Sequence, residues 1–408
     1  MTPEAEQPNV LVVVLKVVLA AWVLRAVNAA LSLALVPDLA PAPRRKEGGP
    51  LVSIVVPARD EERSLREATR SKCLQDDPAF EVVVVDDRSS DGTRGILRRL
   101  EGEFPATLRV VDGVEPPPDW LGKPHALDEG ARAARAARPG DWLVFSDADV
   151  VFAPDLLARA LAHADRNRLD FLTLLPQMDA RGFGERLMVP TIPAAAFCYL
   201  PGWLMNVPSA RSFGGGGGVF NLIRRDLFDR IGGHEALKAS VVDDIQLGRN
   251  ARLAGGRTGI DLALDSISLR MYHGFPEIVK GLEKNGFFGL LGSVPMAVLV
   301  LTLFFLEGIL ASFVAAGGAL EHLLARGGAG SAFFTIKEIF LSLLIIGLTV
   351  LVRGALDLRL RLGLVSTLLH PIWVACFTWI FARSTFVYGV LHRNEWRGRV
   401  RDARTLKT

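Results

Sequence analysis

The sequence predicts an α/β domain with a mostly parallel sheet, joined to membrane helices at both ends of the chain. From Leu51 onward, short apolar runs alternate with stretches of helical periodicity, a pattern typical of a mostly parallel sheet covered by helices. Apolar residues make up 50% of the 408 residues and charged residues only 22%. The mean hydropathy of +0.29 is high for a soluble enzyme, and the apolar excess lies near the two chain ends.

The alternating region divides into successive strands and helices, and we expect it to form one catalytic domain over 51–289. A dinucleotide-binding fold has the same alternation. The first strand, however, is followed by Pro57-Ala-Arg-Asp-Glu-Glu62, which lacks the glycine-rich turn that brings a pyrophosphate to a helix. This argues against a nicotinamide cofactor. The expected strands are 51–56, 81–85, 108–111 and 142–145, and the expected helices are 61–73, 91–103 and 124–137.

Net charge and cysteine spacing narrow the functional classes further. The formal net charge of +3 gives no support for a nucleic-acid partner. Cys73, Cys198 and Cys376 are scattered without metal-ligand spacing, so we expect no disulfide framework.

The first apolar run, 10–36, is long enough to cross a bilayer. A signal peptide is the competing interpretation, but the residues before the run include Glu4 and Glu6 instead of the basic residues that such a peptide needs. A basic cluster, Arg44-Arg-Lys46, follows the run, and the positive-inside rule places it in the cytoplasm. We expect a retained anchor in the cell (inner) membrane, with 1–9 outside and the catalytic domain cytoplasmic.

Two stretches after the alternating strands have unusual composition. The apolar stretch 187–207 is interrupted by Pro190, Pro193 and Pro201, is followed by Pro208 and contains Trp203. We therefore interpret it as a segment in the membrane interface, with buried core as the alternative. Gly214–Gly218 is a run of five glycines with apolar flanks, which is unusual for a flexible linker. We expect its backbone to approach a ligand closely.

The C-terminal membrane region, 290–391, is followed by a basic tail, 392–408. Basic residues in the tail favour the cytoplasm, which three full crossings from a cytoplasmic domain would not allow. We therefore expect the first two apolar segments to cross and the third to re-enter. The three segments are about 295–316, 333–352 and 363–391.

Carboxylates follow two of the expected strands. Asp147 and Asp149 lie on either side of Ala148, just after strand 142–145, where open α/β sheets hold their ligands. In an extended segment, residues two apart project to the same side, which suits a hard divalent cation and the phosphates it carries. A turn residue and a helix cap are the alternative roles. After strand 81–85, helix capping explains Asp91 but not Asp86 or Asp87, of which we prefer Asp87 as a ligand contact.

Two further motifs supply a cation and a base. Lys123 follows Gly122 at the entrance of a helix, where it is a candidate for binding a diphosphate, with solvated surface as the alternative. Asp243 and Asp244 stand at the start of a later helix. We assign Asp244 as a candidate general base and Asp243 as a helix cap or a supporting acid.

These motifs, in this order, resemble those of family-2 inverting glycosyltransferases. The chain is most similar to their membrane-bound branch, which includes ceramide glucosyltransferases and bacterial enzymes associated with hopanoid and carotenoid glycosylation. The resemblance covers about 52–289. It rests on P-A-R-D-E-E, V-V-D-D-R-S-S-D-G-T, G-K-P-H-A-L, D-A-D and V-D-D-I-Q-L-G.

The resemblance implies a single Rossmann-like domain that binds a nucleotide-diphosphate sugar, preferably a UDP-sugar, with Mg²⁺ or Mn²⁺. By motif position it implies a metal ligand at Asp149 and a general base at Asp244. The implied contacts to the nucleotide sugar are Pro57, Ala58, Arg59, Glu61, Asp87, Lys123 and Asp147. The implied acceptor-side and donor-side residues are Gly217, Gly218, Asp243 and Lys284.

One departure from the family pattern concerns the acceptor. Ceramide and polysaccharide-synthase relatives carry Gln-x-x-Arg-Trp after the base, whereas this chain has Gly281-Leu-Glu-Lys-Asn-Gly-Phe287. Lys284 is the candidate replacement for the arginine, but the tryptophan is missing. We therefore expect transfer of a single sugar to a hydroxyl or carboxyl group of a membrane lipid. The alternatives are a polyprenyl-phosphate glycosyltransferase and a catalytically inactive membrane scaffold.

Overall fold

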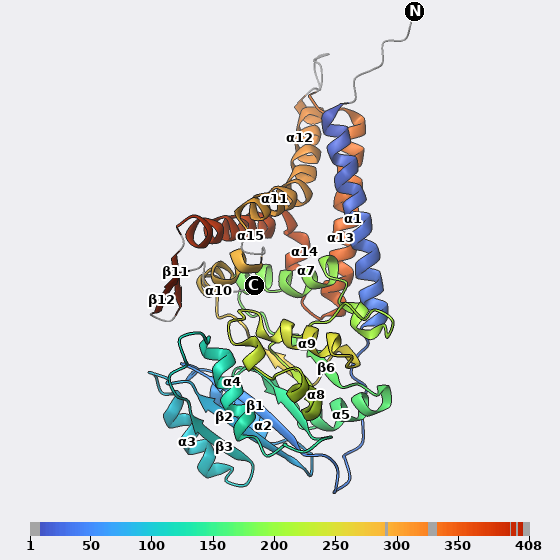
Figure 1. Ribbon diagram of the computed structural model, residues 1–408. Helices are drawn as coiled ribbons and strands as arrows, with labels where there is room; N and C mark the ends of the chain where they lie inside the picture. Colours follow the sequence, from blue (N-terminus) through green and yellow to red (C-terminus); the bar gives the residue numbers. More distant parts are fainter. Residues whose placement is uncertain (1–8, 290–292, 325–332, 392, 397–398, 403–408) are drawn as a thin grey trace, which may run out of the picture. The chain divides into compact units, whose positions relative to one another are not determined.

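The computed structural model describes residues 9–289, 293–324, 333–391, 393–396 and 399–402. These residues form two compact units. The first, which we call the sheet unit, consists of Ala34–Asp179 and Gly202–Met271. The second, the helical unit, consists of the residues up to Leu33, Ala180–Pro201 and the residues from Tyr272 onward. Figure 1 shows the elements of both units along the chain.

The sheet unit is built on a seven-stranded sheet with the strand order β3-β2-β1-β4-β8-β6-β9. All strands run parallel except β8, which pairs antiparallel with both β4 and β6. This confirms the predicted mostly parallel sheet. The strands are β1 (Val52–Ala58), β2 (Phe80–Asp86), β3 (Leu108–Asp112), β4 (Trp142–Phe145), β6 (Phe171–Leu175), β8 (Asn221–Arg224) and β9 (Thr258–Leu262).

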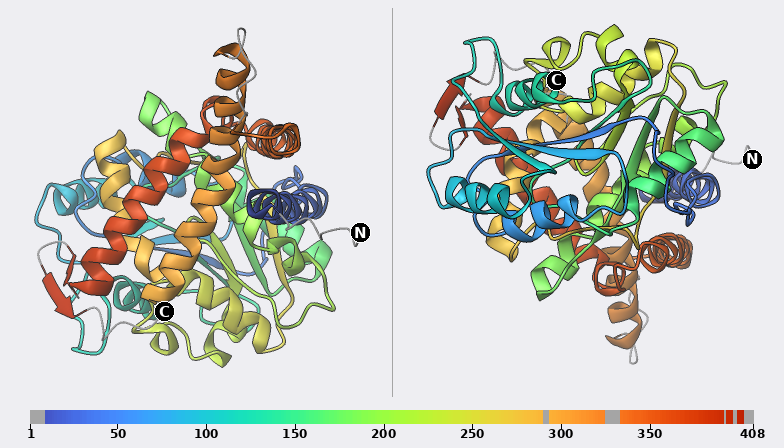
Figure 2. Two further views of the ribbon diagram at one scale, coloured as in Figure 1. Left: turned by 90° about the horizontal axis from the view of Figure 1, so that it is seen from above. Right: turned by 90° about the horizontal axis from the view of Figure 1, so that it is seen from below.

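Helices pack on both faces of this sheet because the strand side chains alternate between two apolar cores (Figure 2). Ile54 and Val56 of β1 face one core, whereas Val55 faces the other. The first core includes α2 (Leu65–Cys73), α3 (Thr93–Glu103) and α5 (Leu156–Asn167). The second includes α4 (Gly122–Ala133), α8 (Arg225–Arg230) and α9 (Asp243–Leu253). A smaller sheet holds β5 (Val151–Phe152), β10 (Ile267–Leu269) and β7 (Gln177–Met178).

Tertiary hydrogen bonds shorten two of the predicted helices. α2 begins at Leu65 instead of residue 61, because the Glu61 N–H donates to Thr93 Oγ1 (2.7 Å) and leaves a turn in its place. α4 ends at Ala133 instead of residue 137, because the Arg135 N–H donates to Glu81 and the Ala136 N–H donates to Ser53 Oγ. Helical periodicity continues in both places, so only these long-range contacts end the helices.

Among the described residues, four helical stretches are long and apolar enough to cross a membrane, and all except the last two residues of the first lie in the helical unit. They are Val10–Leu35, Val294–Leu324, Ile336–Arg359 and His370–Val390. They are compatible with membrane association at the regions predicted. The first is α1. The second contains α11 (Val294–Phe305), the π-helical segment η3 (Leu306–Leu310) and α12 (Ala311–Leu324). The third is α13, and the fourth joins α15 (His370–Ser384) to the π-helical segment η4 (Thr385–Val390).

Shorter elements complete the described part of the chain. The proline-rich stretch 187–207 does not form one helix: it includes the end of α6 (Phe183–Met188), then α7 (Thr191–Tyr199) and the 3₁₀ turn η1 (Gly202–Asn206). The helical unit also contains α10 (Phe275–Gly289) and α14 (Val365–Leu368). β11 (Arg393–Trp396) and β12 (Arg399–Asp402) pair with each other, and η2 (Glu235–Leu237) precedes α9.

Two helical glycines should respond in opposite ways to alanine. A Cβ on Gly248 of α9 would lie 1.8 Å from the Gly215 carbonyl oxygen, whereas a Cβ on Gly95 of α3 meets nothing within 4 Å. We expect Gly248→Ala to lower the free energy of unfolding by about 1–3 kcal/mol. Gly95→Ala should raise it by about 0.5–1 kcal/mol, because alanine favours the helix. Denaturant unfolding of the full chain in detergent measures both, and equal effects would contradict the packing of α9 against the glycine run.

Candidate active site

The candidate site lies at the carboxyl ends of three adjacent strands, β2, β1 and β4. Ala58 ends β1, and its carbonyl accepts a hydrogen bond from the Asp87 N–H (2.8 Å) after β2. Pro57 lies beyond the last β1 residue paired with β4, Val55, so its missing N–H interrupts no bond to β4. The loops after these strands therefore project from one edge of the sheet.

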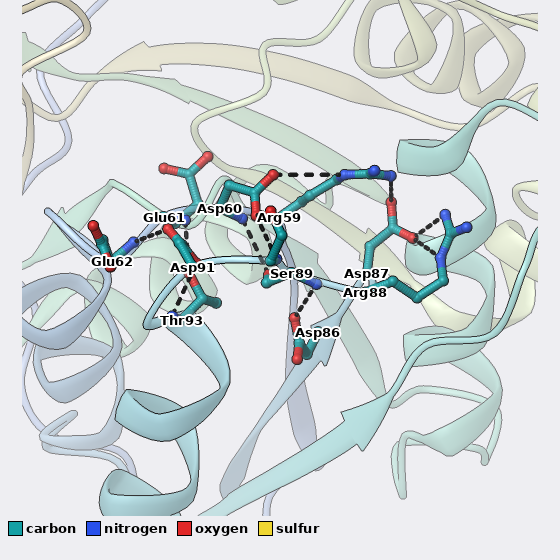
Figure 3. A network of polar contacts seen from close by, with 11 residues as sticks. Arg59, Asp60, Glu61, Glu62, Asp86, Asp87, Arg88, Ser89, Asp91 and Thr93 are labelled. Carbon is teal, nitrogen blue, oxygen red and sulfur yellow. Dashed lines mark hydrogen bonds and ion pairs between the residues drawn. The ribbon is translucent and has the colours of Figure 1, made fainter. Parts of the chain in front are cut away.

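The loops after β1 and β2 are joined by a polar network (Figure 3). Asp60 accepts a hydrogen bond from the Ser90 N–H (2.7 Å), and the Glu62 N–H donates to Asp91 (3.2 Å). Asp91 also accepts from the N–H of Thr93, the first residue of α3, but Gly92 occupies the N-cap position, so Asp91 is not the helix cap predicted from the sequence. The network holds the two loops together over the end of the sheet.

Asp86 and Asp87 have different environments within this network. Asp86 accepts from the Ser89 N–H (3.1 Å) and so stabilises its own turn. The Asp87 side chain lies between two arginines, 2.6 Å from Arg88 and 3.4 Å from Arg59. A buried carboxylate held by two guanidinium groups is fixed in direction and available at the strand edge.

Lys123 links the loop after β4 to the start of α4. Its Nζ lies 2.6 Å from Asp147 Oδ1. A small cavity beside this pair is lined by Lys123, Asp147, Gly218, Asn221, His234, Asp243 and Asp244 among others. The structure thus places both acids at the start of α9 beside the lysine and the first aspartate of D-A-D.

The acids of this cluster strongly repel one another. Burial raises the pKa of Asp149 to about 6, and the charge of Asp147 adds to the shift. Burial also raises the pKa of Asp243 to about 6 despite Lys123, with repulsion from Asp244 and Asp147, and it raises the pKa of Asp244. Burial and the neighbouring carboxylates together therefore disfavour the charged forms of these acids.

Two lysines oppose this negative charge. Burial alone would lower the pKa of Lys123, but Asp147, Asp243 and Asp244 outweigh it and raise that pKa above its usual range. Lys72 of α2 lies beneath the D-A-D turn, fully buried, and donates to the Val150 carbonyl. Burial lowers the pKa of Lys72 to about 8.

The glycine run approaches the acids of the protein itself. A Cβ on Gly218 would lie 2.6 Å from Asp147 Oδ2, and a Cβ on Gly216 would lie 2.3 Å from the Asp244 carbonyl oxygen. Gly217 is less confined, with Thr173 Oγ1 at 3.7 Å from the position of a Cβ. The glycine run thus lies close to the carboxylates and backbone that surround the site, and its close approach to a ligand stays a prediction.

Three further residues of the predicted site are Asp243, Glu61 and Lys284. Asp243 is the first residue of α9, and Val242 occupies the N-cap position, so Asp243 is not the helix cap. Glu61 lies in the turn before α2, where its N–H is bound to Thr93. Lys284 lies in α10, but its side chain is outside the part of the structure that is described.

The available donors suit a cation that is bound partly by its substrate. No group of three or more His, Cys, Asp or Glu side chains among the described residues is arranged to hold a metal ion. Asp149 and Asp147 are the nearest candidates, and one or two carboxylates are what Mg²⁺ uses when phosphates and water complete its coordination. The residues present therefore fit a metal–diphosphate complex.

Sequence reasoning missed two buried groups of this site, Lys72 and His234. His234 Nδ1 has no hydrogen-bond partner among the described residues, and its ring packs edge-on against Phe145 at 4.5 Å. Burial and the charge of Lys123 lower its pKa to about 3, so the imidazole is neutral. Neither residue stands in a motif, and only the fold brings them to the site.

Comparisons with known proteins agree with this geometry. Residues 49–280 match the family described as "Glycosyltransferase like family 2". The chain is 28% identical over 363 residues to 4,4'-diaponeurosporenoate glycosyltransferase of Staphylococcus aureus strain MRSA252, covering 85% of this chain and 87% of that protein. The protein of the same name from strain bovine RF122 / ET3-1 is 27% identical, with the same coverage. The family predicted from the motifs is thus confirmed.

One solved structure matches nearly the whole chain. Mannosyltransferase PcManGT from Pyrobaculum calidifontis, in complex with GDP-Man and Mn²⁺, has a TM-score of 0.51 at 19% identity. The match covers 93% of this chain and 98% of that chain. At this identity the similarity shows the fold, and it confirms the predicted fold class.

The raised pKa of Asp149 predicts a pH-dependent stability. Because its pKa of about 6 lies above the ordinary value of 3.8, the folded state binds more protons than the unfolded state between these pH values. Its contribution to the free energy of unfolding therefore falls as pH rises through that window. Without divalent cations, wild type should gain stability relative to Asp149→Asn when pH is lowered from 7 to 5.

Thermal unfolding of both proteins in chelator measures this difference. Asp165→Asn, which removes a carboxylate with a 67% exposed side chain, serves as the matched control. A constant difference between wild type and Asp149→Asn across this pH range would contradict the crowded acid cluster.

Proposed function

The chain belongs to glycosyltransferase-like family 2, and we propose that it moves one sugar from a nucleotide-diphosphate sugar to a membrane lipid. The observation that carries the proposal is the cluster of four carboxylates around Lys123 at the strand ends, with raised pKa values for Asp149, Asp243 and Asp244. A site with this excess of negative charge favours a cation. A diphosphate bound to that cation completes the neutralisation.

The donor is proposed to bind along the three strand ends, with a UDP-sugar preferred. Asp87, held by Arg59 and Arg88, is positioned to accept a hydrogen bond from the nucleoside. The Asp149 carboxylate would bind Mg²⁺ or Mn²⁺. Asp147 would contact the nucleotide, because Lys123 already pairs with it. The mannosyltransferase of similar fold, solved with GDP-Man and Mn²⁺, supports a metal-bound nucleotide sugar.

Different groups of the cluster are proposed to stabilise charge and to act as the base. When bound, the metal ion supplies positive charge to the leaving diphosphate. Lys123 adds a second cation to the same diphosphate. Asp244 accepts the proton of an acceptor hydroxyl. As it does so, the hydroxyl oxygen attacks the anomeric carbon of the sugar, and the bond from that carbon to the diphosphate breaks. In-line attack of this kind inverts the anomeric centre.

The acceptor is proposed to be a lipid with a hydroxyl or carboxyl group. The Staphylococcus aureus relative is named for a carotenoid acid, diaponeurosporenoate, which supports a carboxyl acceptor. The four long apolar helices support an acceptor that reaches the enzyme from the membrane. We further propose that the sheet unit faces the cytoplasm at the inner membrane, and that the third apolar segment, 363–391, re-enters instead of crossing.

The two acceptor groups make different demands on Asp244. A hydroxyl keeps its proton at neutral pH, so its attack needs a base, which contributes about 10²- to 10⁴-fold in rate. A carboxyl group is already ionised near neutral pH and attacks without one. A polyprenyl phosphate, the alternative acceptor, likewise needs little base catalysis.

Asp149→Asn should remove the metal dependence of donor binding. We expect Mn²⁺ to strengthen UDP binding by the wild-type chain at pH 7.5 by about tenfold or more, since the ion links the carboxylate to the diphosphate. The variant should bind UDP equally with and without Mn²⁺. Isothermal titration of the full chain in detergent measures this, with Asp165→Asn as control. Metal-enhanced binding that survives in Asp149→Asn would contradict the assigned ligand, and no UDP or GDP binding by wild type would favour the inactive scaffold.

Asp244→Asn separates the acceptor classes. For a hydroxyl acceptor we expect kcat to fall about 10²- to 10⁴-fold while the affinity for UDP changes little. For a carboxyl acceptor the fall should be much smaller. Release of UDP from a panel of sugar donors in native lipid extract, with mass spectrometry of the glycosylated lipid, measures both. Near-intact turnover with a product glycosylated on a lipid hydroxyl would rule out Asp244 as the base.

A further inference from the structure

A large cavity of the sheet unit lies away from the catalytic edge. Its volume is about 980 Å³, and it runs along β9, the last strand of the sheet, from Arg257 and Thr258 to Asp261. β9 stands three strands beyond β4, and at about 4.8 Å per strand this separates the cavity from the D-A-D turn by roughly 14 Å. The cavity is therefore separate from the proposed donor site.

Three arginines line this cavity: Arg211, Arg252 and Arg257. Arg252 is 6% exposed, and its guanidinium donates only to neutral acceptors, namely Thr258 Oγ1 and the carbonyls of Met205, Val207 and Ala210. Arg211 and Arg257 are exposed, and their side chains have no carboxylate partner within the part of the chain that the structure describes. The cavity thus has a positive charge that the protein does not neutralise.

The acids near the cavity do not cancel this charge. Asp261 lies 3.1 Å from His163 Nδ1. Burial, with the charge of Asp38, raises the pKa of Asp261 to about 7, so near neutral pH it is only partly ionised. Asp170 is 3.3 Å from Arg224 and accepts from the Arg257 N–H. An anion that enters the cavity therefore meets a net positive surface.

Part of the cavity lining is apolar and includes the end of a candidate membrane helix. Leu35, the last residue of α1, and Pro37 line it, and Leu253 adds further apolar surface. Asn206 links Leu35 to β9, since its Nδ2 donates to the carbonyls of Leu35 (2.7 Å) and Ile260 (2.8 Å). If α1 crosses the bilayer, Leu35 stands at the level of the lipid headgroups.

We propose that this cavity binds the phosphate headgroup of an anionic phospholipid, with Arg211 and Arg257 contacting the phosphate and Leu35, Pro37 and Leu253 contacting the start of the acyl chains. Arg252 adds positive charge to the cavity, but its guanidinium N–H groups already donate to protein acceptors and so do not contact the ligand. Basic side chains at headgroup depth attract anionic lipids in this way. The combination of charge and apolar surface favours a lipid over a free phosphate.

Lipid bound here would touch segments that continue into the proposed active site. α9 begins with Asp243 and Asp244 and ends beside the cavity at Arg252 and Leu253. The loop whose carbonyls Arg252 holds, 205–210, leads directly to the glycine run that packs on Asp147 and Asp244. The cavity and the acid cluster thus share one helix and one loop.

The test uses the full chain in neutral detergent and a short-chain phosphatidylglycerol as probe. Isothermal titration compares wild type with the double variant Arg211→Ala/Arg257→Ala. We expect saturable binding by wild type that weakens on the order of tenfold or more in the double variant. The matched control, Arg66→Ala/Arg99→Ala, removes two exposed arginines of α2 and α3 and should bind as wild type does.

Further arms of the experiment identify the ligand source. Phosphatidylcholine should bind much more weakly than phosphatidylglycerol, and inorganic phosphate at equal concentration should not displace the lipid. Competition by inorganic phosphate as strong as that by the lipid would show a free-anion site and overturn the proposal. Equal lipid binding by all three proteins, or equal loss in both double variants, would also overturn it. UDP binding by each variant reports whether the sheet unit remains folded.

Discussion

The ion pair between Lys123 and Asp147 is the interaction on which the rest of the candidate site depends. It joins the first turn of α4 to the loop after β4, and it is the nearest compensation for four carboxylates at one sheet edge. Without a cation in that position, Asp243 and Asp244 would meet the charge of Asp147 directly, at a location where burial already disfavours their ionised forms. The cluster can persist only because opposite charge is built into it.

Close backbone packing is the second constraint, and glycine makes it achievable. Gly216 and Gly218 bring the loop before β8 against the carbonyl of Asp244 and the carboxylate of Asp147, and Gly248 lets the same loop lie on α9. Side chains at these positions would push the loop and the helix apart. The glycine run therefore sets the separation between the D-A-D turn and the acids of α9, and hence the space in which donor and acceptor would meet.

The prediction from sequence was accurate where the deciding interactions are local. Alternation of apolar runs predicted β1, β2, β3 and β4 and the helices between them. A strand of a parallel sheet is buried on both faces, so its sequence is a nearly continuous apolar run. It failed at the ends of α2 and α4, where Thr93, Glu81 and Ser53 capture backbone N–H groups from distant segments. Lys72 and His234 were missed for the same reason, since nothing in their local sequence marks them.

Local patterns were sufficient to predict the fold class and the family, because these follow from periodicity and from motifs that stand at strand ends. The three-dimensional structure was needed to show that β8 enters the sheet antiparallel between β4 and β6, and that α9 lies against the glycine run. It also separated Asp86, which stabilises its own turn, from Asp87, which two arginines hold at the sheet edge. The place of β8, the packing of α9 and the environment of Asp87 have the same physical reason. Each depends on contacts between segments far apart in the chain, which a local sequence pattern does not predict.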